Sequence, residues 1–225
     1  ANRLILPAVV LCVTCLLLTA CAGKKTHEAD RVRSVVVNLA AKQAADPDVP
    51  GLSVAVLRRG QDAPISAAFG TASLEIPTPV TTASRFKIGS VTKVFTGTLI
   101  HRLIEEGKLS YDTPISQFFP TYPNGKAITV RNLLEHTSGI PEMLALPAVQ
   151  QNLARYWSPE DLIALVAKQP PLFKPGTRQL YCNTGFLMLA VIAEKITGRT
   201  YTEQVQEIFV EKLGMKTLLA GVDSA

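Results

Sequence analysis

Cysteine and histidine are scarce in this sequence, and their positions exclude several kinds of site. There are four cysteines among 225 residues, and three of them, Cys12, Cys15 and Cys21, lie in the first 21 residues. Cys182 is therefore alone in the remainder, where no internal disulfide can form. The three histidines lie far apart. No His-Glu-x-x-His motif occurs, and no Cys-x-x-Cys pattern lies beyond the N-terminal segment, so the sequence predicts neither a metal site nor a cofactor.

The sequence also lacks the basic clusters that are typical of nucleic-acid-binding proteins. Lys and Arg number 23 against 18 Asp and Glu, a formal charge of +5, but the only adjacent basic pairs are Lys24–Lys25 and Arg58–Arg59. We therefore expect no nucleic-acid partner. Internal repeats and low-complexity stretches are absent, and 47% of the residues are hydrophobic. This composition is sufficient for one globular domain with a substantial core.

The N-terminal residues have the features of a signal peptide. Residues 1–20 carry one charge, Arg3, followed by an apolar run to Leu18, which is short for a membrane-spanning helix. The run ends in LTAC, and small residues before a cysteine resemble a bacterial lipoprotein signal. The resemblance implies cleavage before Cys21 and a lipid on Cys21, which would tether the protein to a membrane of the bacterial cell envelope, on the periplasmic side. A plain signal peptide or a membrane anchor would be the simpler alternative.

The remaining sequence predicts strands first and helices afterwards. Residues 21–47 predict a tether that runs into a helix, and residues 48–225 predict one domain. Short β-type runs at 51–57 and 64–70 predict a hairpin. From Ser90 onward the hydrophobic period is helical, and we expect helices near residues 90–107, 129–136, 158–168, 183–198 and 200–214. This order favours an α+β fold, with an antiparallel sheet flanked by helices and an inserted all-helical subdomain.

The pattern Ser-x-x-Lys, which can place a nucleophile beside its own base, occurs twice. Ser84 precedes Lys87, and Ser90 precedes Lys93. The alternating stretch around Lys87 predicts an extended chain, in which residues three apart point to opposite faces. Ser90 opens a predicted helix, in which residues three apart share a face and the N-terminus favours developing negative charge. Ser90 and Lys93 are the better pair, although a helix-capping serine beside a solvated lysine gives the same pattern.

The pattern Tyr-x-Asn also occurs twice. Residues 122–124 are followed by a glycine and predict a surface turn. Tyr181-Cys182-Asn183 lies between a loop and the apolar helix that follows it. Such a corner can hold a side chain firmly against a neighbouring helix. Cys182 is expected to be a small packed residue rather than a reactive thiol.

Four segments, in this order, resemble the serine β-lactamase and penicillin-binding-protein superfamily, in its class C and D-Ala-D-Ala carboxypeptidase-like branch. They are FKIGSVTKVFTGTLIHRLIEEGKL, ITVRNLLEHTSGIPE, FKPGTRQLYCNTGFLMLAVIAEKITG and EIFVEKLGMKTL. The resemblance implies that Ser90 is the nucleophile, Lys93 its partner, Tyr181 a proton-transfer residue and Asn183 a hydrogen-bonding residue of the substrate site. It also implies that HTSG, which begins at His136, is a structural helix-ending turn and not part of the catalytic machinery.

Residue types of this kind suit acyl transfer. A serine hydroxyl is a weak nucleophile until a neighbour accepts its proton. A lysine can accept it if burial and a nearby cation lower the lysine pKa, and a tyrosine beside the lysine can share the proton and pass it to the leaving group. An acyl-enzyme would then form on Ser90. The resemblance implies a small-molecule or peptide substrate: a β-lactam, a D-Ala-D-Ala peptide or an ester.

One motif of the superfamily does not occur in the chain. A Lys-Thr-Gly or His-x-Gly on a downstream strand is absent, and the residues after Asn183 predict helices and turns. We therefore expect this chain to be the N-terminal portion of a longer enzyme, to lack the C-terminal strands and to be inactive alone. The alternative is a non-catalytic envelope lipoprotein with a degenerate penicillin-binding-like fold that binds a cell-wall ligand or a partner.

We predict that Cys21 is the mature N-terminus and carries the lipid. Mass spectrometry of the N-terminal peptide, taken from full-length protein made in a bacterial host, measures this directly. A mature protein that starts elsewhere, or an unmodified Cys21, would contradict the prediction. In lipoprotein signals of double-membraned bacteria, an aspartate after the cysteine marks retention at the inner membrane. Ala22 occupies that position, so we expect the outer membrane in such a host.

Overall fold

The structure, a computed structural model, describes residues 28–221. The boundary between two compact units of the chain falls between Phe86 and Lys87. The predicted signal at residues 1–20 and the lipidation site Cys21 lie outside the described residues. The domain limits predicted at residues 20 and 47 stay a prediction.

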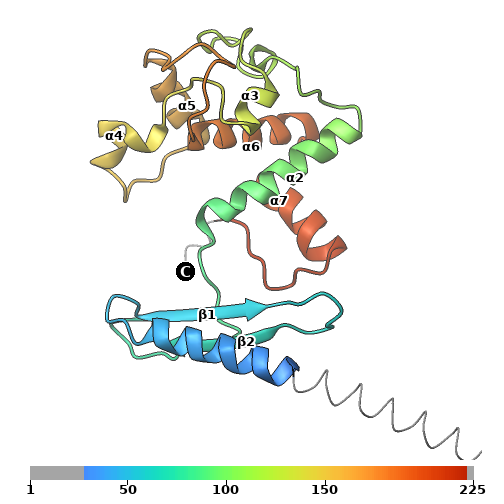
Figure 1. Cartoon of the computed structure of the whole chain (residues 1–225). Helices are drawn as coiled ribbons and strands as arrows, with labels where there is room; N and C mark the ends of the chain where they lie inside the picture. The colour runs from blue at the N-terminus through green and yellow to red at the C-terminus, as the bar shows by residue number, and fades with distance from the viewer. Residues whose placement is uncertain (1–27, 222–225) are drawn as a thin grey trace, which may run out of the picture. The chain divides into compact units, whose positions relative to one another are not determined.

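The first unit contains a β-hairpin with a helix beside it, residues 28–44 (Figure 1). Strands β1 (Gly51–Val56) and β2 (Ile65–Gly70) pair antiparallel over their whole length. The predicted hairpin is confirmed, and each strand is one residue shorter at the loop than predicted.

Gly70 is the residue that the end of the hairpin requires. Its φ is 82°, and a Cβ atom at this position would lie 2.2 Å from the carbonyl oxygen of Pro50. Because only glycine avoids both the strain and the clash, the sequence here determines where the strand pairing stops.

The second unit is built from helices around α6, which packs against α2, α3 and α5 (Figure 1). Its elements are η1 (Gly89–Val91), α2 (Thr92–Glu105), η2 (Ile115–Gln117), α3 (Val130–Leu134), η3 (Met143–Ala145), α4 (Pro147–Gln150), α5 (Pro159–Ala167), α6 (Asn183–Thr197), α7 (Tyr201–Val205) and the π-helical segment η4 (Gln206–Lys212). With the antiparallel hairpin, the chain is α+β, as predicted. None of the helices within residues 28–221 combines the length and hydrophobicity needed to cross a bilayer.

Aliphatic side chains of α6 form the centre of the helical core. Met188, Leu189 and Ile192 are fully buried, and they share one cluster with Ile100 of α2 and Leu133 of α3. Burying one such side chain contributes about 1.5–3 kcal/mol relative to leaving it exposed. The core therefore holds α2 and α6 together, and both helices begin at the candidate site.

Local signals set most helix ends where the sequence predicted them. The Ser158 hydroxyl accepts a hydrogen bond from the Asp161 amide and caps α5, Thr129 caps α3, and Gly198 ends α6 with a φ of 69°. Two predicted helices differ. The helix expected from Ser90 begins at Thr92, because residues 89–91 form a tighter 3-10 turn. The helix expected over 200–214 divides into α7 and η4.

We predict that Ile100→Ala destabilises the full-length protein by about 2–5 kcal/mol, because it leaves a cavity in the core. Val94→Ala, on the same helix, is the matched control, since Val94 is 66% exposed and Ile100 is 0% exposed. The control should change the free energy of unfolding by about 0.5 kcal/mol or less. Urea unfolding of both variants measures the difference, and equal effects would contradict the packing described.

Candidate active site

Ser90 and Lys93 lie together where the chain enters α2. Ser90 is the middle residue of η1, and Lys93 is in the first turn of α2. The Lys93 ammonium donates a hydrogen bond to Ser90 Oγ, with 3.3 Å between Nζ and Oγ. The two side chains therefore share one face of the chain even though Ser90 precedes the α-helix proper.

Tyr181 and Asn183 reach the same two side chains from the start of α6. The Tyr181 hydroxyl and Ser90 Oγ are 2.6 Å apart and share a hydrogen bond. Lys93 Nζ donates to Asn183 Oδ1 at 2.6 Å and lies 4.7 Å from the centre of the Tyr181 ring. All four predicted site residues thus form one hydrogen-bonded group. Ser90 and Tyr181 are exposed, and Lys93 and Asn183 are half-buried.

The turn that carries Tyr181 and Asn183 is held on its buried side by Cys182. The thiol donates to the carbonyl oxygen of Ile140, with 3.4 Å between sulfur and oxygen, and only 3% of Cys182 is exposed. Burial raises the pKa of the thiol above its usual range. Cys182 is therefore a neutral, packed residue, which agrees with the expectation from the sequence.

Glu142 holds the first turn of α6. Its carboxylate accepts a hydrogen bond from the amide of Asn183 at 2.5 Å and one from the amide of Leu144 at 3.0 Å. A carboxylate at a helix N-terminus satisfies a free N–H group and is favoured by the helix dipole. Glu142 therefore fixes the backbone of Asn183 and sets where its side-chain amide can meet Lys93.

The charge of Lys93 changes the acidity of the phenol beside it. The Lys93 ammonium, and after it the hydrogen bond with Ser90, lower the pKa of the Tyr181 phenol below its usual range. A nearby cation stabilises the phenolate form, which accepts protons. By contrast, burial raises the pKa of the Tyr122 phenol. The two Tyr-x-Asn motifs therefore differ in proton chemistry as well as in position.

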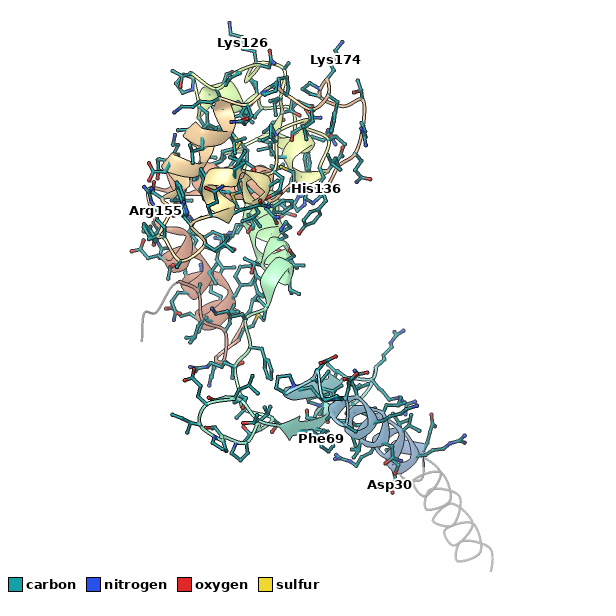
Figure 2. The ribbon with its side chains drawn as sticks, turned by 90° about the vertical axis from the view of Figure 1, so that its left-hand side faces the viewer. Asp30, Phe69, Lys126, His136, Arg155 and Lys174 are labelled. Atoms are coloured by element: carbon teal, nitrogen blue, oxygen red, sulfur yellow. The ribbon has the colours of Figure 1, made fainter. Side chains whose placement is uncertain are left out.

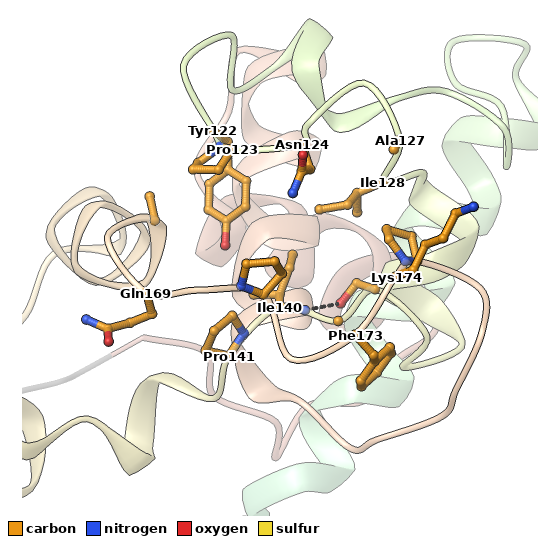
Figure 3. A pocket seen from close by; sticks show the side chains of 15 residues that line it. Tyr122, Pro123, Asn124, Ala127, Ile128, Ile140, Pro141, Gln169, Phe173 and Lys174 are labelled. Atoms are coloured by element: carbon orange, nitrogen blue, oxygen red, sulfur yellow. Dashed lines mark hydrogen bonds between the residues drawn. The ribbon is translucent and has the colours of Figure 1, made fainter.

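Ser84 and Tyr122, which belong to the other copies of the two repeated motifs, do not join this hydrogen-bonded group. Ser84 Oγ accepts a hydrogen bond from the amide of Thr81 at 2.9 Å and closes a local turn. Tyr122 lines a separate cavity of about 480 Å³, together with Asn124, and its phenol points into that space (Figure 3). None of the four predicted site residues lines this cavity, although Ile140, whose carbonyl accepts from Cys182, is one of its lining residues.

The structure adds three residues to those predicted for the site. Glu142 and Phe186 were not predicted, and His136, predicted to be structural, contacts the turn of residues 181–183 directly. Phe186 could have been found, because it follows Asn183 by three residues and so shares its helical face; its ring centre is 5.5 Å from Lys93 Nζ. No local signal points to Glu142, since its partner lies 41 residues away.

Comparisons with known proteins identify a family and several similar enzymes. A family model described as Beta-lactamase matches residues 36–225. A β-lactamase from Pseudomonas fluorescens is 30% identical over 188 residues, which are 82% of this chain and 50% of that protein. A D-aminopeptidase from Cereibacter sphaeroides is 33% identical over 171 residues, 75% of this chain and 32% of that protein.

A solved structure supports the same assignment at the level of the fold. The D-amino acid amidase from Ochrobactrum anthropi SV3, complexed with L-phenylalanine, matches with a TM-score of 0.72 and 26% identity. The match covers 81% of this chain and 50% of the amidase.

The α+β fold and a serine grouped with a lysine and a tyrosine are the arrangement expected of the superfamily that the sequence resembles. The chain belongs to the β-lactamase family, whose model matches most of its length. It spans half or less of the length of the relatives described above.

We predict that Tyr181 titrates below the usual tyrosine pKa of about 10 and that Tyr122 titrates above it. The sign follows from the cation beside Tyr181 and the burial of Tyr122. Phenolate absorbance of the full-length protein, followed as the pH rises, measures both groups. Tyr181→Phe should remove the component that ionises first, and Tyr122→Phe should leave that component in place. An unchanged early component in Tyr181→Phe would show that another tyrosine is the more acidic group.

Proposed function

We propose that this chain carries the acyl-transfer site of a serine hydrolase, with Ser90 as the nucleophile. The observation that carries the proposal is the position of Ser90 Oγ, which is 2.6 Å from the Tyr181 hydroxyl and 3.3 Å from Lys93 Nζ. A nucleophile and its base within hydrogen-bonding distance, with the base oriented by a third group, is the arrangement that activates a serine.

Tyr181 is the group best placed to take the Ser90 proton. It forms the shorter of the two contacts with Ser90, and its pKa is lowered by Lys93 and then by Ser90. As Ser90 Oγ bonds to the substrate carbonyl carbon, its proton moves to the phenolate oxygen of Tyr181. When the carbon–nitrogen or carbon–oxygen bond of the substrate breaks, Tyr181 returns the proton to the leaving nitrogen or oxygen. Water then hydrolyses the ester on Ser90.

Lys93 and Asn183 hold this arrangement in place. The Lys93 ammonium stabilises negative charge on Tyr181 and on the Ser90 oxygen during proton transfer. Asn183 accepts one hydrogen bond from Lys93 through its Oδ1, which leaves the two N–H donors of its side-chain amide to meet a substrate carbonyl.

The substrate we propose is a small molecule or peptide with an amide or ester bond. Relatives named as a β-lactamase, a D-aminopeptidase and a D-amino acid amidase support an amide substrate. The exposure of Ser90 and of Tyr181, which is 51% exposed, supports direct access from solvent. For localisation we propose the bacterial cell envelope, with the lipid on Cys21 as the anchor; this part rests on the N-terminal sequence alone.

We predict that a fluorophosphonate, or a fluorescent penicillin, labels Ser90 in the full-length protein. Ser90→Ala should abolish labelling. Lys93→Ala and Tyr181→Phe should each lower turnover of a good ester or amide substrate by about 10²–10⁴-fold, because Tyr181→Phe removes the group that transfers the proton and Lys93→Ala removes the cation that enables Tyr181 to accept it. Peptide mapping of the adduct and steady-state kinetics are the measurements.

Tyr122→Phe and Ser84→Ala are the matched controls, since each changes the second copy of a repeated motif. Both should retain labelling and turnover. A label on Ser84, or a label that survives Ser90→Ala, would refute the assignment. Absence of any adduct on a folded full-length protein that still binds a cell-wall peptide would favour the non-catalytic lipoprotein instead.

A further inference from the structure

We propose that His136 is a positioning residue of the acylation site: its neutral imidazole holds the turn of residues 181–183 in place, and protonation of the imidazole releases the turn and slows acylation in acid. The inference rests on the proposed roles of Ser90 and Tyr181, and it adds a pH-dependent control to the same site. His136 lies in the helical unit, near the start of α2 (Figure 2).

The backbone at His136 has a conformation that usually selects glycine. His136 follows the last turn of α3 with a φ of 58°. The amide of Thr137 donates to the carbonyl of Asn132 at 2.8 Å, and the amide of His136 donates to that of Leu133 at 3.4 Å. This pair of bonds is the Schellman ending of a helix, in which the left-handed residue is most often glycine and sometimes asparagine. The left-handed conformation of a residue with a Cβ atom is unfavourable by roughly 1–2 kcal/mol. The histidine at this position therefore lowers the local stability of the helix end.

The side chain and carbonyl of His136 both contact the catalytic turn. Imidazole Nδ1 accepts a hydrogen bond from the amide of Cys182, with 3.2 Å between the nitrogens. The His136 carbonyl accepts from the amide of Leu180 at 2.9 Å. The imidazole also lies between two aromatic rings, with centroid distances of 4.7 Å to Tyr181 and 5.1 Å to Phe186. One residue therefore fixes the backbone on both sides of Tyr181 and supports its ring.

The hydrogen bond from Cys182 requires an imidazole without a proton on Nδ1. The neutral tautomer with its proton on Nε2 has a free lone pair on Nδ1, whereas the imidazolium carries protons on both nitrogens and accepts nothing. Protonation would therefore set an N–H group against the amide N–H of Cys182. Either the ring or the turn must then move, and the turn carries Tyr181 and Asn183.

The surroundings place this protonation on the acid side of neutrality. Burial, and after it the positive charge of Lys93 on α2, lower the pKa of His136. The carboxylate of Glu142, which lies just before η3, acts in the opposite direction. The phenol ring of Tyr181 and the backbone amide of Cys182 contact the imidazole from the turn itself. The neutral form therefore predominates above a pKa that lies below the usual value of about 6.5, and it is lost as the pH falls through that lower value.

Two substitutions separate the backbone from the hydrogen bond. His136→Asn suits the left-handed conformation, and its Oδ1 is separated from the backbone by the same number of bonds as Nδ1, so it can accept from Cys182 without titrating. His136→Gly suits the backbone still better but has no acceptor. Neither change should unfold α3. His101→Asn is the matched control. His101 lies outside the site, where its Nδ1 forms a hydrogen bond with the Tyr111 hydroxyl, with 2.9 Å between the two atoms.

The test measures the rate of fluorophosphonate labelling of the full-length protein against pH. Protonation of Tyr181 lowers the rate in every variant as the pH falls, and in the wild type and in His101→Asn we expect a further fall of up to about tenfold per pH unit, beginning below pH ~6.5. His136→Asn should lose this further fall. His136→Gly should be slower than His136→Asn at every pH, by on the order of 10–10²-fold, because a misplaced turn lowers the rate without removing a reacting group.

Two outcomes would overturn the inference. His136→Asn could keep the further acid fall of the wild type, which would assign that fall to another group. His136→Gly could label as fast as His136→Asn, which would leave the hydrogen bond without effect. NMR adds a readout that does not depend on activity: titration of His136 should shift the amide resonance of Cys182. That shift tests the inference even if labelling survives Ser90→Ala and the proposed nucleophile is wrong.

Discussion

The hydrogen bond from the Lys93 ammonium to the side-chain oxygen of Asn183 joins the starts of α2 and α6, and the rest of the candidate site depends on it. Nζ lies 2.6 Å from Oδ1, and both side chains are half-buried. A hydrogen bond to a charged group contributes about 1.5–3 kcal/mol. The bond also fixes the position of the ammonium relative to Ser90, because the same ammonium lies 3.3 Å from Ser90 Oγ. The core around Met188 and Ile100 keeps the two helices packed, so one cation can serve groups from both.

This arrangement shifts the pKa values of two neighbouring ionisable side chains in opposite directions. Tyr181 is exposed beside the cation, and its pKa is lowered, whereas Cys182, the next residue, is buried against backbone carbonyls, and its pKa is raised. Desolvation disfavours a charged form, and a nearby opposite charge favours it. A single turn can therefore present one group for proton transfer and keep the other inert. The carboxylate of Glu142 completes the turn by capping α6.

The helix end at His136 shows how local stability and function compete. In the part of the chain that the structure describes, the residues other than glycine with positive φ are Asn124 and His136. Asparagine and histidine are both found in that conformation more often than most residues, but any residue with a Cβ atom adopts it at a cost in conformational free energy. In natural proteins, residues that break a local rule are expected at functional sites. Here the residue that departs from the rule uses its side chain to accept a hydrogen bond from the amide of Cys182, in a turn 46 residues away.

The sequence by itself determined the features that depend on near neighbours. The hairpin, the caps at Thr129 and Ser158, the end of α6 at Gly198 and the pairing of Ser90 with Lys93 all involve residues within a few positions of one another, so their patterns are visible in the chain. Even there the start of α2 was misplaced, because a 3-10 turn precedes it. The sequence favoured Tyr181 over Tyr122, but only the tertiary structure shows the contact of Tyr181 with Ser90, which spans 91 residues. It alone revealed the contacts of Glu142 and His136 with the turn, which span 41 and 46 residues. The physical reason is that such contacts arise from how helices pack across the core, and no local pattern of residue types records which distant partner that packing brings within hydrogen-bonding distance.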